Sequence, residues 1–274
     1  MRIALGYHLR KLREDAGIQM EQLSEDHLMS ISKVSRMETG KRACKASDVA
    51  ELLRRYGVGE PDIALVLELV EGSVQPGWWR PYAKVLPKWF EPLVGLETAA
   101  EMIRTCEAQV VPGLMQTEEY ARGMATLSRL EDAFADQRVA LRLERQDRIL
   151  GGAEGPRLWA VIEETALVRG AFGAEVMRAQ MQRLRHLSEH PRVTLQVVPF
   201  DRVYLEPYIP FTYLRFTEPE LPNTVYVEYL KGAKYLDGPE DVNNHLEMLD
   251  TLVGYALTRR QTQDRLEEAI RFYR

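Results

Sequence analysis

Hydrophobic residues in the first 72 positions recur every three or four residues, which is the spacing of one face of an α-helix. The first run ends at Gly17, and four further runs follow it between residues 20 and 70. Ser47 is the predicted N-cap of the fourth helix, and Gly40 is predicted to end the third in the left-handed conformation. Five short helices with short connections predict a compact all-α domain over residues 1–72.

A segment rich in tryptophan and proline, PGWWRPYAKVLPKWFEP at residues 76–92, follows these helices. Its four prolines exclude a long regular helix, and we assign residues 73–95 as a connection between two domains. One interpretation is an irregular segment that packs its aromatic side chains onto a neighbouring domain. The alternative is a surface that stacks nucleobases, because Arg80, Lys84 and Lys88 lie among the aromatic residues.

The pattern becomes mixed from about residue 96. Helical spacing covers residues 97–107, 116–127, 132–149 and 174–188. Two amphipathic helices are predicted near 239–257 and 261–272, and Asp237 is the predicted cap of the first. Strand patterns are RLWAVIEE (157–164), RVTLQVVPF (192–200), FTYLRF (211–216) and TVYVEYL (224–230). No long helix separates the last three strands, which favours antiparallel pairing. Residues 96–274 are therefore predicted to form a mixed α/β domain with a small, mainly antiparallel sheet, and the fold class is α+β.

Charge is distributed unevenly along the chain. Residues 1–57 carry 11 Lys and Arg against 8 Asp and Glu, a net charge of +3, whereas residues 58–274 carry 25 against 33, a net charge of −8. The net charge of −5 for the whole chain therefore hides a basic N-terminal part. This asymmetry is typical of a basic binding module joined to an acidic domain.

The composition, with 45% hydrophobic and 28% charged residues, is that of a globular protein. No apolar stretch reaches the roughly 20 residues of a membrane span, and the N-terminal residues do not resemble a signal peptide, so we expect a soluble, cytoplasmic protein without membrane contact. Cys44 and Cys106 lack CxxC spacing, so neither a disulfide framework nor a zinc site is expected.

The basic segment SISKVSRMETGKR, residues 30–42, contains the third predicted helix. At roughly 100° per residue, Val34 and Met37 point inward, whereas Ser32, Ser35 and Arg36 point outward. Short hydroxyl side chains permit close approach to base edges, and an arginine can pair bidentately with guanine. These three residues are therefore the predicted base-reading residues. The predicted contacts to the DNA backbone are Ser30, Lys33, Lys41, Arg42 and Lys45.

An isolated helix with this composition could also be an ordinary solvated surface helix. Its context favours a role in DNA binding, because a short helix and a turn of three to four residues precede it, as in a helix-turn-helix. The stretch GIQMEQLSEDHLMSISKVSRMETGKR resembles the Xre and lambda-repressor type of helix-turn-helix. Met20 stands where that family commonly has glutamine, and Leu28 stands where its turn often has glycine. The residues that match the family's recognition segment are Ser30, Ser32, Val34, Ser35, Arg36, Glu38 and Gly40.

The remainder of the chain resembles a large actinobacterial group of such regulators, which carry an uncharacterised C-terminal domain sometimes called antitoxin-like. The matching stretches include WWRPYAKVLPKWFEPLVGLETAA, IRTCEAQVVPGLMQTEEYAR, RLERQDRIL and TVYVEYLKGAKYL. The resemblance implies transcriptional regulation and a small partner protein encoded by an adjacent gene.

Catalytic motifs are absent from the sequence: there is no GxSxG, P-loop, HExxH, or GxGxxG after a strand. His186 and His190 have a spacing that can hold a metal, but no third ligand is near them in sequence. Glu163 and Glu164 are adjacent on a predicted strand and would point to opposite faces. The stretch VVPGLMQTEEYA at residues 110–121 is interpreted as a turn and a helix start capped by Thr117, with a ligand-contacting loop as the alternative. We expect no enzymatic activity, no cofactor and no metal.

The sequence therefore predicts a sequence-specific, homodimeric transcriptional regulator that binds double-stranded DNA and whose C-terminal domain senses a partner protein or a signal. Two half-sites would supply the affinity and specificity that one short helix lacks. The alternative is an antitoxin-like protein-interaction module that binds a small protein from a neighbouring gene, with DNA binding secondary. A small-molecule sensor is a third hypothesis.

Overall fold

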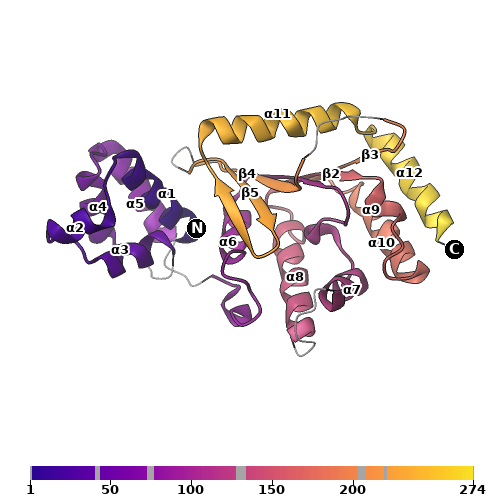
Figure 1. Ribbon diagram of the computed structural model, residues 1–274, viewed down its shortest axis with the longest axis horizontal. Helices are drawn as coiled ribbons and strands as arrows, with labels where there is room; N and C mark the ends of the chain where they lie inside the picture. Colours follow the sequence, from indigo (N-terminus) through magenta and orange to yellow (C-terminus); the bar gives the residue numbers. More distant parts are fainter. Residues whose placement is uncertain are drawn as a thin grey trace. The chain divides into compact units, whose positions relative to one another are not determined.

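The computed structural model describes residues 2–40, 44–72, 77–127, 134–202, 208–218 and 221–273. The chain divides into two compact units. The first contains residues 1–81, 91–99 and 216–222, and the second contains residues 82–90, 100–215 and 223–274. The first unit is helical and the second combines a six-stranded mixed sheet with helices (Figure 1), which confirms the α+β fold class.

Helices form the first unit, in the order α1 (Arg2–Asp15), α2 (Met20–Glu25), α3 (Ile31–Glu38), α4 (Ala46–Arg55) and α5 (Glu60–Gly72). A later helix, α6 (Glu91–Ala99), packs against α1. Gly40 has a φ of +64°, so the predicted left-handed end of α3 is confirmed. The prediction for Ser47 is wrong, because α4 begins at Ala46 and its N-cap is Lys45. The apolar stripes meet in a core that includes Leu5, Leu9, Leu23, Val34, Met37, Val49, Leu52, Leu53 and Ile63.

Residues 77–92, the described part of the tryptophan-rich segment, contain no long helix, as the prolines predict, and form the 3₁₀ turn η1 (Arg80–Tyr82) before α6 begins at Glu91. Trp79 is buried in the first unit, where its indole N–H donates to Glu91 at 3.2 Å. Trp78 meets Trp79 edge to face, with ring centroids 5.9 Å apart. The buried indole of Trp79 therefore serves packing within this unit.

The sheet of the second unit has the order β3-β2-β1-β4-β5-β6. Its strands are β1 (Met102–Glu107), β2 (Arg157–Glu163), β3 (Val193–Val198), β4 (Phe211–Arg215), β5 (Thr224–Tyr229) and β6 (Gly232–Leu236). The strands β4, β5 and β6 pair antiparallel, and β4 also pairs antiparallel with β1. The predicted antiparallel pairing of β3 with the later strands is wrong, because β3 pairs parallel with β2. The connection between these two strands contains α10 (Ala174–Leu187), which supplies the helical crossover that parallel pairing requires.

Residues 102–107 form the strand β1, so the helix predicted over residues 97–107 is wrong for this part. This strand lies between β2 and β4, and Ile103, Thr105 and Cys106 are all buried. Burial on both faces removes the polar alternation of a half-buried strand, and the remaining apolar spacing looks helical. The short strand β6 also went unpredicted.

Helices cover both faces of the sheet (Figure 1). On one face lies α11 (Pro239–Tyr255), whose Val242, Leu249 and Leu252 join a core cluster with residues of β1, β2, β4 and β5. The other face carries α7 (Glu118–Leu127), α8 (Ala135–Leu150), α9 (Thr165–Val168) and α10. The last helix, α12 (Arg259–Phe272), packs against α10, and Leu257 just before it donates a backbone hydrogen bond to β3.

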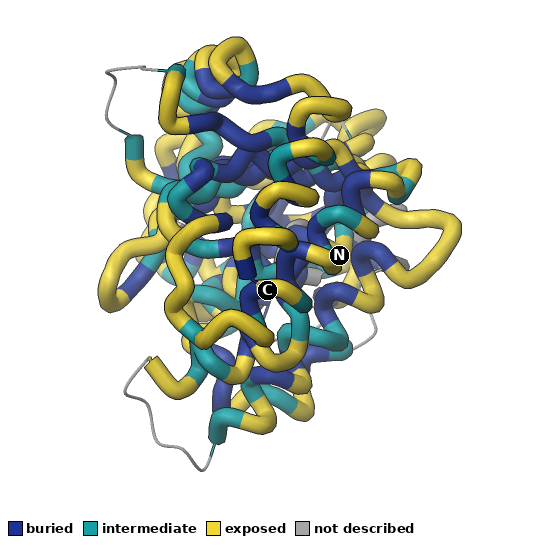
Figure 2. Tube along the Cα trace, turned by 90° about the vertical axis from the view of Figure 1, so that its right-hand side faces the viewer, coloured by how far each residue is buried: buried dark blue, intermediate teal, exposed yellow. Residues whose placement is uncertain are grey.

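The start of α11 differs from the prediction, because its N-cap is Gly238 rather than Asp237. Pro239 occupies the first turn, where a missing backbone N–H costs nothing. Along the helices, buried positions alternate with exposed ones (Figure 2), as the amphipathic patterns require.

Candidate nucleic-acid interface

The helix α3 has the two faces that its sequence predicts. Val34 and Met37 are buried in the first unit, with exposed fractions of 0% and 1%. On the other side, Ser32 and Arg36 are exposed and Ser35 is half-buried. The three predicted base-reading residues thus share the outward side of one helix.

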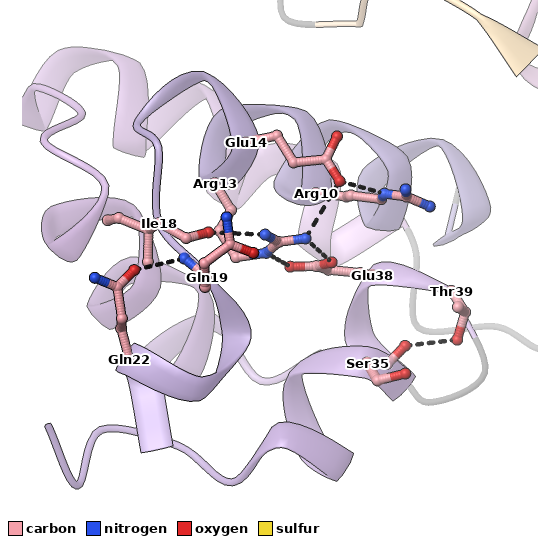
Figure 3. Close-up of polar contacts among 9 residues, drawn as sticks. All are labelled: Arg10, Arg13, Glu14, Ile18, Gln19, Gln22, Ser35, Glu38 and Thr39. Atoms are coloured by element: carbon pink, nitrogen blue, oxygen red, sulfur yellow. Dashed lines mark hydrogen bonds and ion pairs between the residues drawn. The ribbon is translucent and has the colours of Figure 1, made fainter. Parts of the chain in front are cut away.

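Local hydrogen bonds organise the exposed side of α3. The Nε of Arg36 donates to the carbonyl of Ser32 at 3.0 Å, and the hydroxyl of Thr39 donates to the carbonyl of Ser35 at 2.7 Å, a bond drawn in Figure 3. No carboxylate pairs with Arg36 within the part of the chain that the structure describes. A guanidinium in this position can reach an external acceptor by changing rotamer.

The carboxylate of α3, Glu38, points into the unit and pairs with Arg13 of α1 (Figure 3). The pair is bidentate, with Nε–Oε1 and Nη2–Oε2 distances of 2.7 and 3.0 Å, and Arg13 also donates to the carbonyl of Ile18 at 2.8 Å. The side chains of Arg13 and Glu38 are only 6% and 1% exposed. The hydrogen bond with Glu38 raises the pKa of Arg13. The negative charge of α3 is thereby neutralised inside the unit, away from the outward face.

Sequence reasoning assigned no partner to Glu38. A signal was present, because Leu5, Leu9 and Arg13 follow one another at steps of four and so lie on the same buried stripe of α1. A charged residue on a buried stripe requires a buried counter-charge.

A close contact between α1 and the end of α3 fixes the position of α3. A Cβ atom added at Gly6 would lie 2.5 Å from the carbonyl oxygen of Met37 and 2.7 Å from that of Glu38. The absence of a side chain at this position therefore lets the two helices approach closely.

The predicted phosphate-contacting residues have different surroundings. The hydroxyl of Ser30 caps α3 by accepting from the backbone N–H of Lys33 at 3.3 Å. The ammonium of Lys33 lies 2.8 Å from Asp48 of α4, and its side chain is 32% exposed. Lys45 is exposed at the N-cap of α4. Lys41 and Arg42 lie outside the described residues.

The turn between α2 and α3 places a histidine in the left-handed region. His27 has a φ of 56°, its N–H donates to Ser24, and the N–H of Leu28 donates to Leu23. These two bonds are those of a Schellman motif, in which glycine is the usual left-handed residue. The left-handed position therefore falls at His27, one residue before the position where the resembling family often has glycine.

Comparisons with known proteins divide the chain in a similar way. A profile described as a helix-turn-helix domain matches residues 4–66. A second profile, described as domain of unknown function DUF5753, matches residues 90–268, which is more than half of the chain. The chain belongs to the DUF5753 family. No curated protein and no solved structure matches it. Among the described residues of this DUF5753 protein, no helix has the length and apolar character needed to cross a membrane.

The carboxylates at the end of β2 in the DUF5753 region have separate partners. Glu163 accepts a hydrogen bond from the hydroxyl of Tyr208 at 3.2 Å. Glu164 is buried, accepts from the backbone N–H of Phe200 at 2.8 Å and pairs with Arg265. These two neighbouring carboxylates are therefore held apart in different surroundings.

The two histidines near the end of α10 border one pocket of the DUF5753 region, together with Arg183. Burial lowers the pKa of His190, and the nearby Arg192 lowers it further. Within the described residues, no group of three or more His, Cys, Asp or Glu side chains is arranged to hold a metal ion.

Three buried glutamines hold the turn at residues 110–117. Gln116 donates to the carbonyl of Val111 at 2.7 Å. Gln146 of α8 donates to the carbonyls of Gly113 and Gln116, at 2.9 and 3.0 Å. Gln180 of α10 donates to the carbonyl of Met115 at 2.9 Å and accepts from the N–H of residue 117 at 2.8 Å.

These bonds make the turn, which includes the 3₁₀ segment η2 (Gly113–Met115), a structural element of the DUF5753 region. Thr117 caps α7 as predicted, because its hydroxyl accepts from the N–H of Tyr120 at 3.2 Å. Sequence reasoning missed the roles of Gln146 and Gln180. Their partners are backbone groups 30 or more residues away, which leave no pattern in the sequence.

Proposed function

We propose that this DUF5753 protein is a transcriptional regulator of the Xre and lambda-repressor type that binds double-stranded DNA as a homodimer, with α3 in the major groove. The helix-turn-helix match indicates DNA binding and transcription regulation. The observation that supports the role of α3 is its outward side, where Ser32 and Arg36 are exposed while Glu38 is neutralised by Arg13. A helix side with hydroxyls, a guanidinium and no carboxylate suits the acceptor-rich major-groove edge of guanine.

In this proposal, Ser32, Ser35 and Arg36 read bases, and Ser30, Lys33, Lys41, Arg42 and Lys45 contact phosphates. Lys33 would have to exchange Asp48 for a phosphate, or contribute through the charge of the pair. Lys45 needs no such exchange, because it is exposed and takes part in none of the ion pairs within the described residues.

Fluorescence anisotropy with duplexes from the promoter region beside the gene tests base reading. Arg36→Ala and Arg36→Lys should both lose about 1–3 kcal/mol of discrimination at one base position, because lysine keeps the charge without the bidentate fork. Lys45→Ala should weaken binding to all duplexes alike and reduce the salt dependence by about one charge. Arg148→Ala, on α8 of the other unit, is the matched control and should bind as wild type. Equal loss on every duplex for Arg36→Ala would refute base reading.

Dimerisation has a separate test. Analytical ultracentrifugation with and without a duplex should give two chains per duplex, and protection footprints should show two half-sites about 10 base pairs apart or a multiple of that distance. A single chain bound to one half-site at saturating protein would contradict the homodimer.

The second candidate function is an antitoxin-like interaction module that binds a small protein encoded by an adjacent gene. The observation that favours it is the turn between β5 and β6, where Leu230 and Tyr229 have exposed fractions of 95% and 55%. A protein partner that covers this turn would remove the apolar surface of these side chains from water. Co-purification of the wild type and of Leu230→Ser with that small protein tests the idea. Equal recovery with both would exclude this turn as the contact.

We also propose that the DUF5753 region senses a signal or a partner and has no catalytic role. The separate partners of Glu163 and Glu164 support this, because they leave no facing carboxylate pair at the end of β2. Turnover of ester, phosphoester or peptide substrates by the purified protein would contradict it.

A further inference from the structure

A pocket of about 290 Å³ lies within the second unit. Its walls come from segment 82–90, α7, α8 and β5. Most of its lining is apolar, including Phe90 and Met124, and its charged residues are Arg138, Arg142, Arg145 and Glu228. An apolar enclosure with a few convergent polar groups is the usual form of a small-molecule site.

The charges of the described lining residues are unbalanced. They comprise three guanidinium groups and one carboxylate, and that carboxylate, Glu228, also accepts a hydrogen bond from Tyr226 at 2.8 Å. Arg142 donates to the side-chain carbonyl of Gln116, which is neutral. The guanidinium of Arg145 stacks on Phe90, with its Cζ 4.8 Å from the ring centroid. The described lining of the pocket therefore carries more positive than negative charge.

A guanidinium nitrogen at this pocket lacks an acceptor among the described residues. The Nη1 of Arg138 is buried and has no hydrogen-bond partner within the described part of the chain. The charged form of the neighbouring Arg142 is destabilised. Burial, and then the charge of Arg145, lower the pKa of Arg142 to about 10. A buried donor without an acceptor and two neighbouring buried cations both raise the free energy of this arrangement. An anion would relieve both.

We propose that this pocket binds a small organic carboxylate with an apolar, preferably aromatic, body. The carboxylate accepts from Arg138 and Arg142, and the body lies against Phe90 and Met124. The volume is at the small end of ligand pockets, so the ligand is well below drug size. This inference rests on the proposed sensory role of the DUF5753 region and gives that role a ligand class.

The wall formed by segment 82–90 gives the ligand a route to regulation. In the sequence, this segment lies between residues 1–81 and 91–99, which both belong to the first unit, called the helix-turn-helix unit below because the profile match at residues 4–66 lies in it. A ligand that contacts Phe90 therefore acts on the stretch of chain that joins the two units covalently. Regulation would require the ligand to bind one arrangement of this stretch more tightly than another.

Isothermal titration calorimetry on the full chain, without DNA, tests the site. Phenylacetate and indole-3-acetate are the probes, and phenylacetamide is the neutral match of the first. We expect the carboxylates to bind with a Kd of about 1 mM or tighter, and the amide to bind at least about tenfold more weakly. Arg138→Gln should weaken phenylacetate about tenfold or more.

A second variant removes space instead of charge. Ala125 lines the pocket, and Ala125→Leu should also weaken phenylacetate about tenfold or more, while keeping all three arginines. Arg148→Gln is the matched control, because Arg148 lies on the same helix and pairs with Glu144 outside the pocket lining. Circular dichroism spectra and melting temperatures identify any variant that fails to fold. If one pocket variant does not fold, the phenylacetate affinity of the other pocket variant tests the site.

The inference is overturned if neither carboxylate binds the wild type at about 10 mM, if the amide binds as well as the acid, or if the folded pocket variants bind like Arg148→Gln. None of these outcomes depends on DNA. A chain that binds phenylacetate but no duplex would refute the proposed DNA binding and leave the ligand site intact, and the reverse result would refute the ligand site alone.

Discussion

The two candidate sites of this protein differ in how their residues are arranged. In the helix-turn-helix unit, Ser32, Ser35 and Arg36 lie on the outward side of one helix, and the opposite side is buried. In the second unit, the pocket residues come from four segments. A surface built on one helix repeats with the period of that helix. The three arginines of the pocket also follow the period of one helix, α8, but only the fold shows that three other segments join them.

The buried polar centres of the two units differ in the same way. The helix-turn-helix unit holds α3 with the buried ion pair Arg13–Glu38, whereas the DUF5753 region holds its turn at 110–117 with neutral amides. Loss of one member of a buried ion pair leaves a charge without compensation, and loss of an amide leaves dipoles without partners. Mutations can therefore measure how much the stability of each unit depends on its buried ion pair or on its buried amides.

The largest effect is expected for Arg13→Met. Glu38 would then be a buried carboxylate without its partner, and the free energy of unfolding should fall by about 3–5 kcal/mol. Hydrogen exchange should show lost protection in α1 and α3 and unchanged protection in the strands of the sheet. Arg10→Met is the control, because the exposed pair Arg10–Glu14 should contribute less than about 1 kcal/mol. Equal effects of the two substitutions would contradict the importance of the buried pair.

Gln146→Leu is the corresponding change in the DUF5753 region. It leaves the carbonyls of Gly113 and Gln116 without this donor, and the free energy of unfolding should fall by about 2–4 kcal/mol. Urea denaturation measures the loss. Gln137→Leu, at an exposed position of the same helix, should change it by less than about 0.5 kcal/mol. DNA binding should stay at the wild-type level, and a parallel loss of DNA affinity would break the distinction between the two units.

Acid should destabilise the helix-turn-helix unit through His8. Burial, and then the charge of Lys11, lower the pKa of His8 from its ordinary value of 6.5 to about 4, although Asp15 opposes the shift. The folded state therefore favours the neutral ring. Its contribution to stability is fully present above about pH 6.5 and is lost as the pH falls toward 4, by about 3 kcal/mol in all.

The variant His8→Leu removes this proton linkage. Between about pH 7 and pH 4.5, the wild type should lose more stability in urea denaturation than the variant does, and the difference should approach about 3 kcal/mol. The carboxylates titrate in both proteins, so their contributions to the pH dependence of stability cancel in the comparison. Identical pH profiles would show that His8 is protonated without cost.

The smallest effect is expected at the turn between α2 and α3. His27→Gly should raise the melting temperature, because glycine adopts a φ near +56° without the cost of about 1 kcal/mol that a side chain imposes. His27→Ala should lower it slightly, since alanine is disfavoured in this region and lacks the polar side chain of histidine. A lower melting temperature for the glycine variant would mean that the imidazole itself stabilises the turn.

Much of the helix-turn-helix unit was predictable from the sequence. Val34 and Met37 had to lie on one side of α3 and Arg36 on the other, because each residue of an α-helix is rotated by about 100° from the one before it. Gly40 was predictable as its end, since few other residues adopt a left-handed backbone at low cost. The DNA contacts assigned to this helix stay predictions. The caps of α4 and α11 were wrong, because neighbouring backbone conformations and not side-chain types alone decide where a helix begins.

The sequence by itself determined the five helical patterns, the α+β class and the basic character of the N-terminal part, because these depend on periodicity and composition. Only the tertiary structure decided that residues 102–107 form a central strand, that β3 pairs with β2, that Glu38 pairs with Arg13 and that segment 82–90 and β5 line a pocket together with the arginines of α8. Each of these depends on which distant segments come together. Burial from two sides erases the local pattern that would reveal a strand, and a pairing between distant residues has no local pattern at all.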